Sequence, residues 1–372
     1  MEFSTPRAVF PTSDKINVTK THLPEIDIYI GHLHRIWKSS QITNGGKLCR
    51  ELQNQLRDYL GVPHIELLCN GTLALQLSIK ALNLKGEIIT TPYSYVATTN
   101  AILWEGCDPI FADICPKTFC IDPKKIEESI TPRTSAILAT HVYGYPCDVI
   151  RIKEIADKHG LKVIYDAAHA FGVSFKGSSL LTHGDCSTLS FHATKLFHTG
   201  EGGAVVTSNP ELSKRISLMS KFGHLGEDDY FDVGINAKMS ELHAAMGISV
   251  LPSVRTLIED RRRSSICYDE LLQGSSLTMP SQDGNLDYNY AYYPVLFSNH
   301  EAMMKARLAL MEQSIIPRRY FHPSLNTLPF LQPHLRVSCP VSESIASRVL
   351  CLPLFAGMDP EDIRRICTII LG

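Results

Sequence analysis

The chain lacks an excess of charge of either sign. Its 372 residues include 36 Lys and Arg against 38 Asp and Glu, which gives a formal net charge of −2. Nucleic acids and anionic membrane surfaces are bound by concentrated positive charge, and a balanced chain does not supply it. The one basic run, residues 261–263, lies in a helical pattern and is interpreted as a solvated helix face. The sequence therefore predicts no nucleic-acid partner and no membrane partner.

Long apolar runs and paired cysteines are also missing. No stretch approaches the roughly 18–20 apolar residues that cross a bilayer, and residues 1–14 contain no apolar core of a secretory signal. The 11 cysteines are odd in number and include no C-x-x-C pair, which indicates reduced thiols rather than a disulfide framework. His32 and His34 have no further ligands spaced around them, so we expect no metal site. A cytoplasmic, soluble protein is predicted.

The composition that is present is typical of a globular enzyme. Hydrophobic residues make up 44% of the chain and charged residues 20%. A chain of this length can bury a large core, and a large domain plus a smaller one is its natural division. We place the boundary near Pro252. Residues 1–251 would then hold an N-terminal segment and the large domain, and residues 252–372 the small C-terminal domain.

Short β-rich runs alternate with helical patterns between residues 48 and 210. The predicted strands are 88–91, 109–112, 136–140, 163–165, 188–191 and 203–207. Helical patterns such as 149–159 lie between them, and this alternation predicts βαβ units with a largely parallel sheet. A long helical pattern follows from about 238 to 272, interrupted at Pro252, and a strand is predicted at 290–297. Ligands bind at the carboxyl ends of strands in such sheets, where Asp166, His169 and Lys195 fall.

Asp166 and Lys195 form the most informative pair in the sequence. Asp166 ends the apolar run 163–165, and Lys195 ends the run 190–195, after which residues 201–203 read Glu-Gly-Gly. A buried carboxylate is costly without a partner, and the ring N–H of pyridoxal 5'-phosphate (PLP) is such a partner. A lysine amine can bond to the aldehyde of the same cofactor. The pair therefore predicts PLP chemistry, with a helix-capping role as the alternative for Asp166.

Residues 70–72, Asn-Gly-Thr, connect the apolar run 65–69 to the helical pattern 73–84. A strand, a glycine turn and a helix N-terminus form an anion site, because free backbone N–H groups point toward the ligand. Asn and Thr are also common helix caps, so a simple cap is the alternative.

The order and spacing of these segments, from about residue 41 to 354, resemble the DegT/StrS sugar aminotransferases. These are PLP enzymes that aminate keto groups on nucleotide-linked sugars. The resemblance implies the α/β fold of aspartate aminotransferase, known as fold type I. Such a fold has a large, mostly parallel mixed sheet and a smaller C-terminal α+β domain.

The resemblance also implies roles for five cofactor-binding residues. Gly71, Thr72 and Ser190 match positions that contact the cofactor phosphate. Tyr95 matches an aromatic residue that stacks on the pyridine ring, and His169 lies near the ring and its hydroxyl. The alternatives are surface packing for Tyr95, core packing for His169 and a backbone hydrogen bond for Ser190.

Asn236 matches an asparagine that reaches the cofactor phosphate of the neighbouring subunit. The match lies in residues 234–242, where Ala237 departs from the aromatic residue that many members carry. If Asn236 has this role, each active site needs both chains. The resemblance therefore implies a homodimer with shared active sites.

By resemblance, His192 relates to which carbon of the sugar is aminated. Members that act on carbon four resemble Ser-Phe-His-x-x-Lys followed by Glu-Gly-Gly, as found here from Ser190 to Gly203, whereas members that act on carbon three more often carry Tyr in place of the His. His192 would orient the keto sugar or assist proton movement, with a role in the pocket wall as the alternative. Lys195 would be both the covalent anchor and the general acid/base.

The resemblance implies amino transfer from L-glutamate to the 4-keto group of a nucleotide-linked sugar. The favoured acceptor is dTDP-4-keto-6-deoxy-D-glucose. Its 4-amino-4,6-dideoxy product would serve surface polysaccharide, such as the lipopolysaccharide O-antigen, or glycoside biosynthesis. The alternatives are a nucleotide-sugar 3-aminotransferase and a non-catalytic regulatory or binding protein on the same fold.

Overall fold

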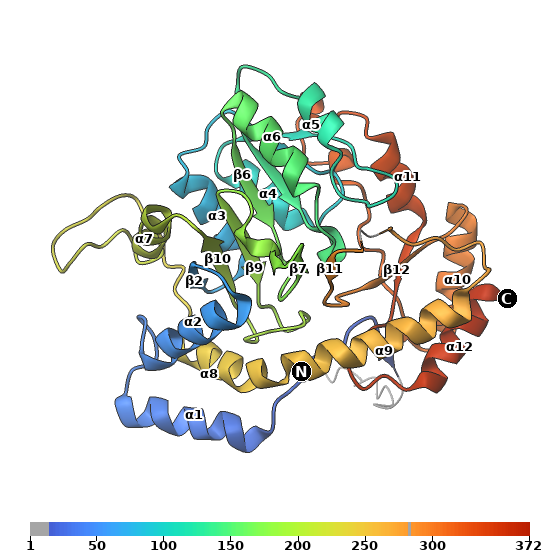
Figure 1. Ribbon diagram of the computed structural model, residues 1–372, viewed down its shortest axis with the longest axis horizontal. Coiled ribbons are helices and arrows are strands. Elements are labelled where there is room, and N and C mark those ends of the chain that lie inside the picture. Colours follow the sequence, from blue (N-terminus) through green and yellow to red (C-terminus); the bar gives the residue numbers. More distant parts are fainter. Residues whose placement is uncertain (1–14, 282–283) are drawn as a thin grey trace, which may run out of the picture.

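A seven-stranded sheet lies at the centre of the computed structural model, which describes residues 15–281 and 284–372 (Figure 1). Its strand order is β2-β10-β9-β6-β5-β3-β4, and only β10 runs antiparallel to its neighbours. The strands are β2 (His64–Leu68), β3 (Glu87–Thr90), β4 (Asp108–Phe111), β5 (Thr134–Thr140), β6 (Lys162–Asp166), β9 (Cys186–Ser190) and β10 (Gly203–Thr207). The predicted large, mostly parallel mixed sheet is confirmed.

Alternate residues of the strands pack into two hydrophobic layers, one on each face of the sheet. Ile88, Leu138 and Ile164 pack with helices α3 (Gly71–Ala81), α4 (Val96–Trp104) and α7 (Pro210–Met219). Their neighbours Ile89 and Ile137 pack on the opposite face with α2 (Lys47–Leu60), α6 (Val149–His159) and α8 (Glu241–Val250). Because both faces of the sheet are covered, the middle residues of β3, β5 and β6 are apolar and buried, which is why these strands are visible in the sequence as short continuous runs.

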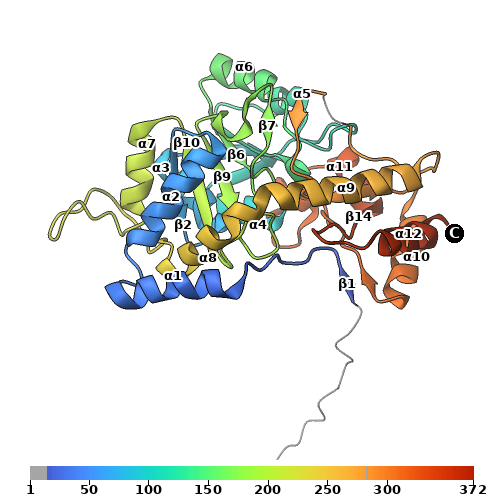
Figure 2. The same cartoon turned by 60° about the horizontal axis from the view of Figure 1, so that its bottom comes forward.

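The C-terminal part of the chain has a hydrophobic core of its own. Tyr268 of α9 (Val254–Leu272) packs there with Val295 of β12 (Tyr293–Leu296) and Leu350 of β14 (Val349–Leu352), and β12 and β14 pair antiparallel. Helices α10 (His300–Glu312), α11 (Pro340–Arg348) and α12 (Pro360–Leu371) complete this part. Helices α8 and α9 run toward it from the sheet, and they meet at Pro252 as predicted (Figure 2). The domain boundary at this point stays a prediction.

The remaining elements are short or peripheral. Helix α1 (Ile26–Ser39) lies against α8, and α5 (Pro123–Glu128) lies against α6. The small strands are β1 (Ile16–Asn17) with β13 (Ile315–Ile316), and β7 (Ser174–Phe175) with β8 (Ser178–Ser179) and β11 (Leu286–Asp287). Among the described residues, no helix is both long enough and apolar enough to cross a membrane.

The interpretation of residues 261–263 as a solvated face is wrong for Arg261. Arg262 and Arg263 are exposed, but Arg261 is buried and its Nη1 donates to the carbonyl of Ala291 at 3.1 Å. Burial lowers the pKa of Arg261 to about 10. Helix α9 packs on the chain just before β12, and this contact between distant segments is invisible in a local charge pattern.

Glu241, at the first position of α8, holds α2 in place. Its side chain is buried, and its two carboxylate oxygens accept hydrogen bonds from the N–H groups of Leu48 and Cys49, each at 2.8 Å. These N–H groups belong to the first turn of α2 and have no partner within the helix. One carboxylate therefore joins the starts of two helices that cover the same face of the sheet.

We expect Glu241→Ala to lower the free energy of unfolding by about 2–4 kcal/mol, because two buried N–H groups lose a charged acceptor. Denaturant unfolding measures the change. Glu241→Gln should lose less, since its amide oxygen still accepts one bond. Glu259→Ala, an exposed change on α9 that removes only a surface ion pair with Arg262, is the control. Equal stability of the Glu241→Ala and Glu259→Ala variants would show that Glu241 has no such role.

Candidate active site

A cavity of about 310 Å³ opens at the carboxyl ends of the strands. It brings together eight residues that the sequence singles out, namely Gly71, Thr72, Tyr95, Asp166, His169, Ser190, His192 and Lys195. They follow β2, β3, β6 and β9, whose carboxyl ends share one edge of the sheet. Asn236 does not line this cavity. It is exposed, and its Oδ1 accepts a hydrogen bond from Lys238 Nζ at 2.6 Å.

Asp166 is buried at the end of β6. Its Oδ2 accepts from Thr98 Oγ1 at 2.7 Å, and its Oδ1 accepts from the N–H of Ala168 at 3.1 Å. Burial raises the pKa of Asp166, and the two hydrogen bonds partly oppose that change. No helix begins in residues 167–173, so the helix-cap alternative has no support. Each oxygen keeps a free lone pair, and the carboxylate can therefore accept a further N–H from a ligand in the cavity.

Lys195 lies in the loop between β9 and β10. Its Nζ lies 3.4 Å from the hydroxyl of Tyr292. Burial lowers the pKa of the Lys195 amine, and the nearby Asp166 carboxylate partly opposes that effect. Since a lowered pKa increases the neutral fraction of an amine, Lys195 has the character of a nucleophile and of a base.

Gly71 and Thr72 at the start of α3 lie beside Ser190 at the end of β9. We call these three residues the α3 cradle. A Cβ added to Gly71 would lie 3.0 Å from Ser190 Cβ, and one added to Gly203 would lie 2.4 Å from the carbonyl carbon of Asn70. Asn70 caps α3, because its Oδ1 accepts from the N–H of Leu73 at 2.8 Å, so the capping alternative holds for Asn70. The glycines allow the helix N-terminus and Ser190 to face the same space, which suits a phosphate group.

His169 is buried behind the cavity. Its Nδ1 accepts from the N–H of Tyr143 at 3.3 Å, and its ring stacks on Phe321 with 5.5 Å between centroids and an angle of 8°. Burial lowers the pKa of His169, and the Lys195 charge adds to that effect, so its ring is neutral. His169 both packs among aromatic rings and lines the cavity.

Two further residues lie at the mouth of the cavity. Tyr95 precedes α4, and 60% of its surface is exposed, so the structure leaves its ring accessible to a ligand. His192 is also exposed, and its Nε2 lies 3.6 Å from Glu201 Oε1. Its Nδ1 accepts from the N–H of Thr194 at 3.2 Å. This hydrogen bond sets the ring orientation, so Nε2 is the nitrogen directed toward Glu201.

The sequence analysis missed four residues of the site. Thr98, which holds Asp166, lies in a run where nothing distinguishes it from its neighbours. Tyr292, Tyr320 and Phe321 also line the cavity, but they come from the C-terminal part of the chain. No local pattern marks these aromatic residues, because their position depends on how that part packs against the sheet.

The model of the DegT/DnrJ/EryC1/StrS aminotransferase family matches residues 27–371. The chain belongs to this family. A dTDP-4-amino-4,6-dideoxy-D-glucose transaminase from Shigella dysenteriae is 43% identical to it, over 95% of this chain and 98% of the relative. A protein of the same name from Escherichia coli is 40% identical, over 96% and 98%. A UDP-N-acetyl-3-dehydro-alpha-D-glucosamine 3-aminotransferase from Acidithiobacillus ferrooxidans is 31% identical, over 87% and 88%.

Solved structures agree on the fold. The crystal structure of DesI in the presence of its TDP-sugar product superposes with a TM-score of 0.91 at 33% identity, covering 96% of this chain and 92% of DesI. Membership of the family and the fold predicted from the resemblance are thus confirmed. The family depends on PLP, and the residues at the cavity fit that cofactor. The α3 cradle suits its phosphate, Asp166 its ring nitrogen and Lys195 its aldehyde.

We expect Asp166→Asn to lower kcat by about 100- to 1,000-fold, because an amide does not stabilise positive charge on the ring nitrogen. Steady-state kinetics with saturating PLP measure this change. Asp157→Asn, which removes an exposed charge on α6, is the control and should behave as the wild type. Near-normal turnover of the Asp166→Asn variant with bound cofactor would leave Asp166 with a structural role only.

Proposed function

We propose that the protein transfers an amino group from L-glutamate to the 4-keto group of dTDP-4-keto-6-deoxy-D-glucose and releases a 4-amino-4,6-dideoxy sugar. The observation that carries the proposal is the convergence of Lys195, Asp166 and the α3 cradle on one cavity. The similarity to the two dTDP-4-amino-4,6-dideoxy-D-glucose transaminases supports the choice of sugar and of carbon four. The relative that acts as a 3-aminotransferase is less similar.

Each residue of the cavity has its own role in the proposed reaction. When bound, PLP supplies an aldehyde for amine exchange and a ring that withdraws electrons from the reacting carbon. Asp166 would hold the proton on the ring nitrogen. The N–H groups of Gly71 and Thr72, with Ser190, would hold the phosphate and so fix the orientation of the ring. Tyr95 would cover one face of the ring, and neutral His169 would lie beside it.

Lys195 moves the proton in both halves of a ping-pong reaction. Once glutamate has displaced it from the aldehyde, the free Lys195 amine would take the proton from the α-carbon of glutamate and return it on the cofactor side; the cofactor would keep the amino group, and water would release 2-oxoglutarate. In the second half the keto sugar would condense with that amino group with loss of water, and Lys195 would move a proton in the opposite direction, onto carbon four of the sugar, before taking back its bond to the cofactor as the amino sugar leaves. His192 lies at the mouth, and we assign it to orienting the keto sugar. Glu201 lies 3.6 Å from Nε2 of its ring.

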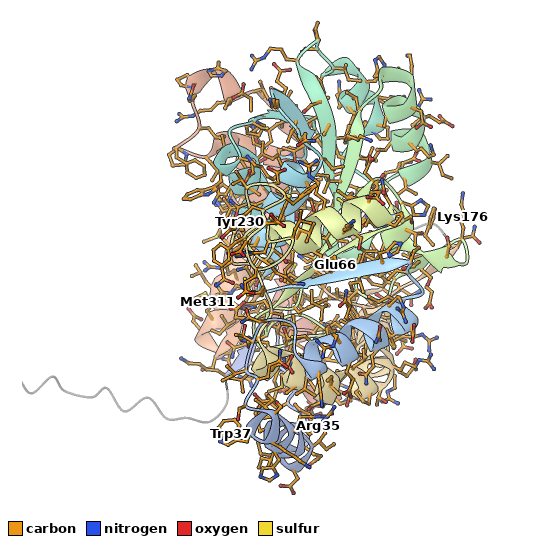
Figure 3. All side chains as sticks on the ribbon, turned by 90° about the vertical axis from the view of Figure 1, so that its left-hand side faces the viewer. Arg35, Trp37, Glu66, Lys176, Tyr230 and Met311 are labelled. Carbon is orange, nitrogen blue, oxygen red and sulfur yellow. The ribbon has the colours of Figure 1, made fainter. Side chains whose placement is uncertain are left out.

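We also propose a homodimer. Apolar side chains are exposed on α1, at Ile28 and Trp37, and in the loop between α7 and α8, at Tyr230 and Val233. This loop projects from the body of the protein in Figure 1, and Figure 3 looks onto the same side and labels Trp37 and Tyr230. Exposed apolar patches of this kind mark protein interfaces. Asn236 lies in the same loop and would reach the partner's cofactor phosphate.

We also propose that the protein acts in the cytoplasm. All eleven cysteines are free, which fits a reducing cytoplasm. There the amino sugar would feed surface polysaccharide, such as the O-antigen of lipopolysaccharide, or glycoside biosynthesis.

A panel of nucleotide-linked keto sugars tests the substrate. With glutamate as donor, we expect the highest kcat/KM for dTDP-4-keto-6-deoxy-D-glucose, and lower values for its UDP and GDP counterparts and for 3-keto isomers. Mass spectrometry of the product, with NMR to locate the amine, measures this. Lys195→Ala should form no product. A preference for a 3-keto sugar would contradict the proposal, and no product from any sugar would favour the non-catalytic alternative.

Hybrid dimers test the shared active site. Lys195→Ala and Asn236→Glu should each be inactive, the second because an acid would repel the partner's cofactor phosphate. In a mixed dimer one site carries both changes and the other carries neither, so mixing should restore activity equal to one native site per hybrid. Subunit exchange is followed with differently tagged chains. If exchange occurs and no activity returns, Asn236 does not act across the interface.

A further inference from the structure

The Lys195 amine has one hydrogen-bond partner within residues 15–281 and 284–372, the hydroxyl of Tyr292, at 3.4 Å. The amine also lies 5.9 Å from the centre of the Tyr292 ring. Tyr292 is buried, lines the active-site cavity and comes from the segment just before β12, far in the chain from the loop that carries Lys195. The reaction described above gives this hydroxyl no task, although it contacts the group that moves the proton.

The hydroxyls of two nearby buried tyrosines bond to groups outside the reaction. Tyr288 Oη donates to the backbone carbonyl of Tyr143 at 2.8 Å. Tyr293 Oη donates to Asp269 Oδ1 at 2.7 Å, in the C-terminal part of the chain. These contacts join one part of the fold to another. Tyr292 differs from both, because its hydroxyl reaches the amine that the reaction uses.

Three aromatic rings hold the ring of Tyr292. Its centroid lies 4.9 Å from that of His169 with an interplanar angle of 71°, and 5.5 Å from that of Tyr320 with an angle of 84°. The ring of Tyr143 lies 5.9 Å away at 55°. Perpendicular contacts of this kind are favourable for aromatic rings. Since the three rings come from different segments, they leave the hydroxyl of Tyr292 little freedom to move.

The backbone before Tyr292 is also fixed. Arg261 Nη1 donates to the carbonyl of Ala291 at 3.1 Å, and Asn289 Oδ1 accepts from the N–H of Ala291 at 3.1 Å. The Nδ2 of Asn289 donates to two carbonyls of the loop after β6, at 2.8 and 3.0 Å. That loop follows Asp166, so the position of Tyr292 is tied to the same part of the sheet as the carboxylate.

The protonation state of Tyr292 follows from its surroundings. Burial raises the pKa of Tyr292, and the buried Arg261 charge opposes that change only in part, so the hydroxyl stays neutral. The other titratable groups whose charges act on Lys195 are Asp166, His169, Tyr95 and Tyr320.

A neutral hydroxyl next to an amine has two consequences. Its oxygen accepts an N–H from the charged amine, and a hydrogen bond to the charged form favours that form, which opposes the effect of burial on Lys195. When the amine is neutral, it can still donate one N–H to the same oxygen, and its lone pair then points elsewhere. One fixed acceptor therefore orients the amine in both of its protonation states.

We propose that Tyr292 is a positioning residue for Lys195, and that its hydroxyl accepts one N–H of the released amine so that the lone pair faces the carbon that gives up its proton. The proposal rests on the proposed function and adds the residue that orients the amine during it. Tyr292 keeps its own proton throughout, so the proton that leaves one carbon is still carried by Lys195 alone.

The cofactor-free protein tests this contact without turnover. Lysines are acetylated over a range of pH in the wild type, Tyr292→Phe and Tyr293→Phe, and the rate at Lys195 is measured by mass spectrometry of its peptide. In Tyr292→Phe the charged amine loses an acceptor, so its pKa should fall and the midpoint of the profile should move to lower pH. Below the midpoint the labelling rate should rise about three- to ten-fold.

Tyr293→Phe is the matched control, because it removes the hydroxyl of the adjacent tyrosine, which bonds to Asp269 and not to Lys195. Its midpoint should equal that of the wild type. The midpoint separates a change in the pKa of Lys195 from a change in access of the reagent, which alters the rate at every pH equally.

The PLP-loaded protein tests the consequence for the reaction. In single turnovers with glutamate, Tyr292→Phe should lower the rate about 10- to 100-fold and leave the Kd for glutamate unchanged, because only the orientation of the amine is lost. Glutamate deuterated at the α-carbon should give a larger isotope effect in Tyr292→Phe than in the wild type, since proton transfer then limits the rate more completely.

The outcomes separate this proposal from the proposed function. If the wild type aminates the sugar and Tyr292→Phe keeps the wild-type midpoint, the role of Tyr292 is wrong and the function stands. A shifted midpoint with an unchanged rate and isotope effect also overturns the role, because the contact then has no effect on the reaction. A raised Kd for glutamate without a shifted midpoint would show that Tyr292 binds substrate instead. A wild type that carries no PLP on Lys195 and forms no amino sugar overturns both proposals.

Discussion

The active site depends on holding the half-buried Lys195 amine and the buried Asp166 carboxylate around one cavity at the carboxyl ends of the strands. Burial alone disfavours the charged form of each group, so the pKa of Lys195 is lowered and the pKa of Asp166 is raised. The field of Asp166 and the hydrogen bonds from Thr98 and Ala168 limit these shifts. In the free protein this arrangement is a cost in stability. It becomes useful when a cofactor with a protonated ring nitrogen and an aldehyde fills the cavity.

The surrounding fold maintains that arrangement through close packing of the backbone. The approach of Gly203 to Asn70, and of Gly71 to Ser190, brings β10, α3 and β9 closer together than residues with a Cβ allow. The start of α3 is thereby aimed at the same space as Lys195. On the far side, aromatic side chains from the C-terminal part complete the wall. The sheet thus sets the positions of Asp166, Lys195 and the α3 cradle, while the opposite wall of the cavity depends on the packing of two parts of the chain.

The sequence predicts some residues of this site and not others, and the difference has a physical reason. Asp166, Lys195 and the turn at Gly71 lie directly after apolar strands, so strand order and length place them at one edge. Tyr292, Tyr320 and Phe321 have no such local signal, because their approach to the cavity depends on contacts between distant segments. The burial of Arg261 has no local signal for the same reason. Asn236 lies outside its own cavity, and its predicted role needs a second chain.

The central claim is that Lys195 bonds covalently to PLP. The most direct measurement is to load the protein with PLP, reduce it with borohydride, digest it and locate the added mass by mass spectrometry. The account predicts that the pyridoxyl phosphate group is found on the peptide that contains Lys195, and that the Lys195→Ala protein carries none at an equivalent yield. A label on another lysine, such as Lys221 or Lys238, or no label at all in a protein that turns over, would contradict it.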